Sequence, residues 1–209
     1  MALVYDATAT GTASATSLTY AHTCTGSNLI LFVGFSTYDA AEVVTTVTYN
    51  GVAMTQANKK ASAAGDRWSY LYYLIAPATG ANNIVISRSN SGSINSCSTS
   101  YTGAKQSSQP DSSNTNSVLS DTTLTYSTTV VASNCWLVAW SDGANTAGAG
   151  TTTRNTSGSA SGIGDSNGTV STGSQSLIFT VGGAGQIEGV IASIAPFVAA
   201  EGVGFFAFL

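Results

Sequence analysis

Two stretches of the chain are apolar without interruption over the length of a single strand. Residues 28–36 read N-L-I-L-F-V-G-F-S, and residues 135–141 read C-W-L-V-A-W-S. A continuous apolar run of this length, bounded by turn-like residues, is typical of a strand that is covered on both faces. We therefore predict that these two runs are the core strands of a β protein.

Further strands are predicted where apolar and polar residues alternate or where β-branched and aromatic residues are dense. Asn50-Gly51 lies between two such runs and strongly favours a two-residue type I′ hairpin, because both turn positions need a positive φ. No segment keeps a helical period, so we expect about ten to twelve short strands in an all-β fold, an antiparallel two-sheet β-sandwich that is jelly-roll-like. The further strand ranges are 42–49, 52–56, 67–75, 83–88, 93–101, 124–131, 175–181 and 187–194.

Three segments offer little to bury. Residues 7–17 are small and hydroxylated, so residues 1–17 are expected to form an N-terminal arm or an edge strand. Residues 103–119 are predicted to be a polar loop, and residues 142–173 a long surface loop with short edge strands at most. A chain of 209 residues fits one large β domain, so we expect residues 1–209 to be a single sandwich.

The longest apolar stretch is residues 186–209, which end in G-V-G-F-F-A-F-L. On a strand, Val203, Phe205 and Leu209 would lie on one face. Phe206 and Phe208 would lie on the other, so both faces need cover. Residues 198–209 either complete a sheet of their own chain or form an exchanged strand that adds to the sheet edge of another copy.

Composition narrows the choice of partners. Charged residues make up 8% of the chain and the net charge is −4, with no basic cluster, which excludes a nucleic-acid or anionic-lipid surface. Residues 189–200 are too short to span a bilayer, so we expect no membrane insertion. The N-terminus, M-A-L-V-Y-D-A-T, has no basic or apolar part of a secretory signal, so export by another route or within a virion is expected.

Three motifs together resemble a known family. They are Y-N-G-V-A-M-T at residues 49–55, L-I-A-P-A-T-G at 74–80 and Y-T-G-A at 101–104. In this order they resemble jelly-roll domains of phage structural proteins and bacterial surface proteins. The resemblance implies a jelly-roll sandwich, and some subunits of this kind polymerise into extracellular fibrils by lending a terminal segment to the next subunit. The chain differs from larger members in having no visible second domain, coiled-coil stalk or host-binding tip.

Candidate chemistry is sparse. His22 and Cys24 would share one face of a strand, but no orienting group or oxyanion donor can be placed, so a structural histidine is favoured. The carboxylates are scattered singly, whereas a glycosidase needs two that converge across a cleft. Residues 165–168, D-S-N-G, open like a calcium loop but have no closing glutamate, which favours a plain turn. We expect no catalytic, cofactor-binding or metal-binding residues, and therefore no enzyme.

Three other residue types leave alternatives open. Cys24, Cys97 and Cys135 allow one disulfide at most, and buried free thiols are favoured. Asn155 and Asn167 begin glycosylation acceptor patterns. Core packing is favoured over a sugar-binding platform for the clustered aromatic residues, Trp68, Tyr70, Tyr72, Tyr73, Trp136 and Trp140.

These observations favour a structural subunit whose partner is itself. We expect it to assemble head-to-tail into a fibril or virion-associated filament, at an extracellular location or on a virion surface. The candidate assembly residues are Val203, Phe205, Phe206, Phe208 and Leu209. The alternative is a carbohydrate-binding β-sandwich module of a phage or bacterial surface adhesin, with glycans as the partner.

Overall fold

The computed structural model describes residues 1–198, and all of its regular structure in that range is β-strand. Every strand pairing is antiparallel, as the sequence predicts. The strands are β1 (Val4–Cys24), β2 (Ile30–Thr37), β3 (Val44–Tyr49), β4 (Val52–Ala53), β5 (Thr55–Ala61), β6 (Trp68–Ile75), β7 (Gly80–Thr102), β8 (Ser112–Val130), β9 (Trp136–Asp142), β10 (Thr146–Ala147), β11 (Thr152–Ser157), β12 (Ser161–Asp165) and β13 (Gly173–Ile194).

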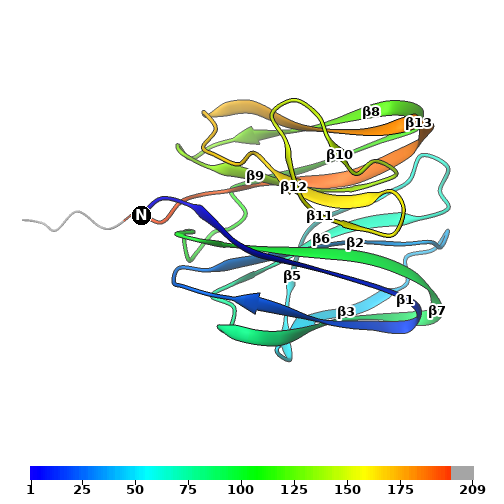
Figure 1. Ribbon diagram of the computed structural model, residues 1–209, viewed down its shortest axis with the longest axis horizontal. Helices are drawn as coiled ribbons and strands as arrows, with labels where there is room; N and C mark the ends of the chain where they lie inside the picture. Colours follow the sequence, from blue (N-terminus) through cyan, green and yellow to red (C-terminus); the bar gives the residue numbers. More distant parts are fainter. Residues whose placement is uncertain (199–209) are drawn as a thin grey trace, which may run out of the picture.

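The strands form two sheets that pack face to face (Figure 1). The first sheet has the order β4-β3-β7-β2-β6-β5, with β1 also paired to β7. The second has the order β10-β13-β9-β12-β11, with β8 also paired to β13. The predicted antiparallel two-sheet β-sandwich is therefore confirmed.

Each sheet contains two long strands that bend and fold the sheet back on itself. In the first sheet, β1 and β7 stay paired from Val4↔Thr102 to Cys24↔Gly80, with an irregularity between Ala15 and Ser17 at which the extra residues, 88–91, lie in β7. In the second, β8 and β13 stay paired across an irregularity between Thr180 and Gly185. A bulge bends a strand locally, and in Figure 1 both strands of each pair run out and return. Each sheet therefore has an inner layer against the other sheet and an outer layer.

Three apolar cores fill the spaces between these layers. The central core lies between the two sheets and contains Ile30 and Phe32 of β2 with Trp136 and Val138 of β9. The alternate residues of β2, among them Leu31, point into the core of the first sheet. Leu137 and Ala139 of β9 likewise belong to the core of the second sheet. Both predicted core strands are thus covered on both faces.

The two sheets repeat one strand topology. Apart from β4, replacing β1, β2, β3, β5, β6 and β7 by β8, β9, β10, β11, β12 and β13 converts the order of the first sheet into that of the second. The registers agree, because Gly80 pairs with Cys24 and Gly173 pairs with Val130. We name residues 1–104 repeat 1, residues 105–111 the link, and residues 112–198 repeat 2.

The two repeats face each other with equivalent strands. Gly34 of β2 pairs with Cys97, and Trp140 at the equivalent position of β9 pairs with Val190. A Cβ added at Gly34 would lie 2.6 Å from Trp140 Cβ, so the glycine is needed for the indole to fit. Trp140 Nε1 also donates a hydrogen bond of 2.9 Å to Ser36 Oγ. Trp140, the largest fully buried side chain, therefore packs into repeat 1 at a position where repeat 1 has a glycine.

The structure tests the predictions for Asn50-Gly51 and for residues 1–17. The Asn50-Gly51 hairpin is confirmed: Tyr49 pairs with Val52, and the two turn residues have φ of 49° and 75°. Of the two expectations for residues 1–17, the structure shows the edge strand, because β1 begins at Val4 and pairs with β7 alone.

Of the two predicted loops, the one at residues 103–119 is wrong from Ser112 onward, and the one at residues 142–173 is wrong at β12, which is not an edge strand. Strand β8 begins at Ser112, inside the polar loop expected at residues 103–119. The long loop expected at residues 142–173 contains β10, β11 and β12, and β12 is buried throughout between β9 and β11. Its sequence, S-G-I-G-D, has one large apolar residue, and the glycines allow close contact with neighbouring chains instead.

Candidate functional site

One end of the molecule brings together both ends of the described chain and the link. The Met1 amino group donates to the Phe197 carbonyl at 3.1 Å, and the Phe197 N–H donates to the Gly103 carbonyl at 2.7 Å. Ala104 and Pro196 form an isolated antiparallel bridge. We call this end the terminal pole, and it is the end marked N in Figure 1.

Hydrogen bonds hold the link against the end of β13. The buried Gln109 donates from Nε2 to the Ala195 carbonyl at 2.7 Å and accepts from the Ala195 N–H at 3.2 Å. The Asp111 N–H donates to the Ser193 carbonyl at 2.9 Å. The Asp111 carboxylate accepts from the Val131 N–H at 2.7 Å, which fixes the turn before β9. At the terminal pole, hydrogen bonds therefore fix the link against the end of β13 and the turn before β9.

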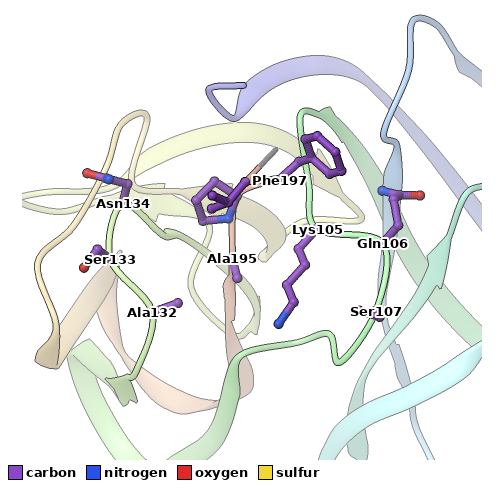
Figure 2. Close-up of a pocket in the computed structure, with 10 residues that line it drawn as sticks. Lys105, Gln106, Ser107, Ala132, Ser133, Asn134, Ala195 and Phe197 are labelled. Atoms are coloured by element: carbon purple, nitrogen blue, oxygen red, sulfur yellow. The ribbon is translucent and has the colours of Figure 1, made fainter. Parts of the chain in front are cut away.

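Two hollows open at the terminal pole, on either side of residues 196–198. The larger, of about 580 Å³, lies between the link and the turn at residues 132–134. Figure 2 shows Lys105 extending into this space, with Ala195 and Phe197 between its two walls. The second, of about 430 Å³, is bounded by Met1 and Leu3. The residues that line the larger hollow are Lys105, Gln106, Ser107, Ala132, Ser133, Asn134, Ala195, Pro196, Phe197 and Val198.

The described residues that line the hollows are apolar or carry hydroxyl and amide groups, apart from Lys105 and the Met1 amino group. Neither lining, as far as the described residues define it, contains a carboxylate, an imidazole or a thiol. Val198, the last described residue, lines both hollows and is 78% exposed. The predicted assembly residues Val203, Phe205, Phe206, Phe208 and Leu209 lie outside the described residues.

His22 lies in a buried hydrogen-bonded chain on β1 and β7. Its Nδ1 is 2.8 Å from Ser98 Oγ and its Nε2 is 2.9 Å from Ser100 Oγ. Ser100 Oγ donates to Asp6 Oδ2 at 2.7 Å. Burial lowers the pKa of His22 to about 4, so the imidazole is neutral at pH 7. The aspartate contacts a serine instead of the imidazole, unlike a catalytic triad. This geometry supports the structural interpretation of His22.

A buried charge cluster, which sequence reasoning missed, joins the two sheets. Glu188 and Asp142 are 0% and 1% exposed. Arg67 Nε lies 2.8 Å from Glu188 Oε1 and 3.6 Å from Asp142 Oδ2. Burial, followed by the neighbouring Asp142, raises the pKa of Glu188 to about 9, so this carboxyl group is protonated at pH 7. The three residues are far apart in the sequence, and no local pattern predicts that they contact each other.

Asp165 takes part in a turn and an ion pair. Its carboxylate accepts from the Asn167 N–H at 2.9 Å, from Tyr101 Oη at 2.8 Å and from Arg154 Nε at 2.7 Å. These contacts support the plain turn predicted for residues 165–168. Within the part of the chain that the structure describes, no three His, Cys, Asp or Glu side chains are grouped so that they could hold a metal ion.

The two glycosylation candidates differ in environment. Asn155 lies half-buried within β11. Asn167 is exposed on a turn with φ of 48° and accepts from Arg154 Nη2 at 2.8 Å. Glycosylation at either position stays a prediction.

The cysteines and the clustered aromatic residues lie in the apolar cores or pack against them. Cys24, Cys97 and Cys135 are all buried and free, as favoured from the sequence, and burial raises the pKa of each thiol. Of the aromatic residues considered as a sugar platform, Tyr70, Trp136 and Trp140 are buried in the cores. The half-buried remainder, Trp68, Tyr72 and Tyr73, packs against the same cores.

Comparison with known protein families, with curated proteins and with solved structures gave no match. Residues 1–198 contain no helix that is long and apolar enough to cross a membrane.

Proposed function

We propose that the protein is a structural subunit that assembles head-to-tail into a fibril or virion-associated filament. Its C-terminal segment, residues 199–209, would add to the next copy. The observation that carries this proposal is that the two repeats of residues 1–198 end differently. After β7 the chain continues as the link into repeat 2, whereas after β13 it returns to Met1, where the double repeat closes.

Within residues 1–198, every strand of repeat 2 has an equivalent in repeat 1. These residues contain three apolar cores whose largest side chains are fully buried. Because the two halves match in this way, we favour exchange of residues 199–209 between copies over their use as a core strand of their own chain.

The energetics are sufficient for a persistent joint. Phe205, Phe206 and Phe208 would contribute about 5–9 kcal/mol on burial in a neighbouring copy, before the cost of ordering the segment. A head-to-tail contact is heterologous and need not close into a ring, so its repetition gives a filament. Only 8% of the residues in the chain are charged, so repulsion between neighbouring copies is weak.

The jelly-roll assignment of the fold stays a prediction, with support from strand order. When each bent strand is counted as two, the inner layer of repeat 1 has its first and last strands side by side, next to β2 and β6. The outer layer joins the second and seventh strands to β3. First-to-last neighbours in one layer are what two nested Greek keys produce. An extracellular or virion-surface location belongs to the same proposal.

Removal of residues 199–209 tests the proposal. We expect a chain that keeps the thermal unfolding midpoint of the full-length protein but stays monomeric in light scattering, while the full chain forms uniform filaments in negative-stain microscopy. A matched full-length variant, with Phe205, Phe206 and Phe208 changed to serine, should also stay monomeric. Filaments from the shortened chain would overturn the proposal, and so would a misfolded shortened chain.

A further inference from the structure

If the C-terminal segment joins copies, as proposed above, it needs an acceptor on the next copy. The hollows at the terminal pole lie beside Val198, where the segment leaves its own repeat. Two copies that filled each other's hollows there would make a reciprocal, isologous pair, which closes after two subunits. An acceptor away from the terminal pole avoids this closure, and β1 and β8, which each pair with one strand only, both leave an edge in the outer layer of their repeat.

The outer edge of repeat 2 is capped by two asparagines. Strand β8 folds back on itself, so that its first half faces its second half. Asn114 Nδ2 donates to the Ser127 carbonyl at 2.9 Å, and Asn116 Nδ2 donates to the Thr125 carbonyl at 2.9 Å. These carbonyls point away from β13, on the side where another strand would add. The amide side chains occupy that side.

Repeat 1 lacks these caps. Asn114 pairs with Ile191 and Asn116 with Gly189, and the equivalent partners in β7 are Ser98 and Ser96. Ser98 and Ser96 pair with Ala9 and Gly11. Neither Ala9 nor Gly11 has a side-chain donor, so the edge carbonyls equivalent to those of Thr125 and Ser127 receive no amide.

Those uncapped carbonyls belong to Thr19 and Ala21 of β1. Within residues 1–198, no hydrogen bond from another element's side chain or loop reaches either carbonyl oxygen. Thr19 and Ala21 are both exposed, whereas Ser127, the counterpart of Ala21, is half-buried. The edge of repeat 1 is therefore more open than its counterpart.

The sequence of this edge also lacks the usual protection. Residues 17–24 read S-L-T-Y-A-H-T-C, without lysine, proline or an acidic residue. Natural edge strands are commonly guarded by charges, proline or bulges, because an unguarded edge can pair with another chain. Here the irregularity between Ala15 and Ser17 lies before the edge, and residues 17–24 pair with β7 without a register shift.

We infer that the outer edge of β1, residues 17–24, accepts the C-terminal segment of a second copy as an added strand. Eleven residues in extended conformation span about 36 Å, and an eight-residue edge needs about 26 Å. The segment can therefore cover the whole edge and keep a short connection to its own repeat. Main-chain hydrogen bonds from residues such as Thr19 and Ala21 supply affinity, and the alternate phenylalanines cover apolar surface on either side.

Thr19→Pro tests this edge. By equivalence to Thr125, the N–H of Thr19 points outward, away from β7. Proline at this position therefore removes a hydrogen bond to the added strand and none to β7. We expect at least a tenfold rise in the protein concentration needed for filament formation, with an unfolding midpoint close to that of the unmodified chain. The matched control is Thr125→Pro, the same change on the capped edge of repeat 2, which should leave assembly unchanged.

Cross-linking identifies the occupant. In a full-length chain with Ala21→Cys and Phe206→Cys, oxidation of assembled material should give covalent dimers and higher multimers. Covalently closed monomers would show that the segment folds back on its own edge, and would overturn the inference. If removal of residues 199–209 abolishes filaments while Thr19→Pro forms them normally, the proposed function stands and this acceptor is wrong. If the shortened chain still forms filaments, both are wrong.

Discussion

Repeats 1 and 2 share their packing and differ in their polar details. Both long final strands begin at a glycine with positive φ, Gly80 and Gly173. Both core strands follow an asparagine in the left-handed region, Asn28 with φ of 51° and Asn134 with φ of 58°. In contrast, the asparagine caps, the β3–β4 hairpin and the buried carboxylates each occur in one repeat only, as far as the structure describes them.

The difference shows which features a repeated fold constrains. Equivalent apolar positions must fill the same cores, so they stay recognisable in both halves. Polar groups at edges and between sheets are free to differ, and function is best sought among them. Four sets of variants test this contrast.

The largest effect is expected where the two repeats interlock. Trp140→Ala should destabilise the protein by about 3–5 kcal/mol, because it leaves a cavity in the central core and removes the hydrogen bond to Ser36. Chemical denaturation monitored by circular dichroism measures the change. Gly34→Leu in the Trp140→Ala background should recover part of the loss by filling the cavity from the opposite repeat. Simple addition of the two single-variant effects would contradict the interlock.

The next effect concerns the buried carboxylate that repeat 1 lacks. Folding raises the pKa of Glu188 from 4.5 to about 9, so the folded state binds a proton that the unfolded state releases at pH 7. The contribution of Glu188 to the free energy of unfolding should therefore be highest below pH 4.5 and fall as the pH rises toward 9. Arg67, Asp142, Tyr38 and Tyr126 are the ionisable groups near this carboxyl group.

Glu188→Gln should remove this pH dependence. We expect the variant to match the unmodified protein at pH 4 and to exceed it by about 1–3 kcal/mol at pH 8. Urea unfolding across that range is the measurement. Equal stability at pH 8 would show that Arg67 keeps Glu188 ionised in the folded protein.

A smaller effect is expected from making the two outer edges alike. Asn114→Ala with Asn116→Gly gives repeat 2 the residues that repeat 1 has at the equivalent positions. Loss of two side-chain hydrogen bonds should cost about 1–2 kcal/mol, and the newly opened edge should increase association in light scattering. Unchanged association would indicate that the asparagine amides do not protect the edge.

The smallest effect is expected in the hairpin that repeat 2 lacks. Gly51 has φ of 75° and open space around its Cα, so a side chain fits but strains the backbone. Gly51→Val should cost about 1 kcal/mol, since β-branched residues rarely adopt positive φ. Thermal unfolding tests this, and an unchanged midpoint would contradict it.

The sequence predicts the fold class well because its signals are local. Asn50-Gly51 and the two buried runs report backbone conformation and burial over a few residues. The bends of β7 and β13 are harder to predict, because the flexible residues within them resemble turns between separate strands. Strands β7 and β13 are therefore each predicted as two short strands.

The repetition and the charge cluster depend on contacts between distant residues. Residues 16–20, T-S-L-T-Y, and residues 122–126, T-T-L-T-Y, carry a readable trace of the duplication. Most other equivalent positions differ in identity and agree only in burial, which a sequence does not display. For Arg67, Asp142 and Glu188, which approach each other only after both sheets have formed, the sequence offers no comparable trace.

The proximity of Met1 to Phe197 gives the chain the connectivity of a closed loop. Because the link crosses the same pole, a circular permutant that joins residue 198 to residue 1 and opens the link would keep every strand in place. In such a permutant repeat 2 would be made first. Any peptide attached to either new end would leave the molecule from the terminal pole, so a display scaffold built on this fold would present its cargo at a single, defined end.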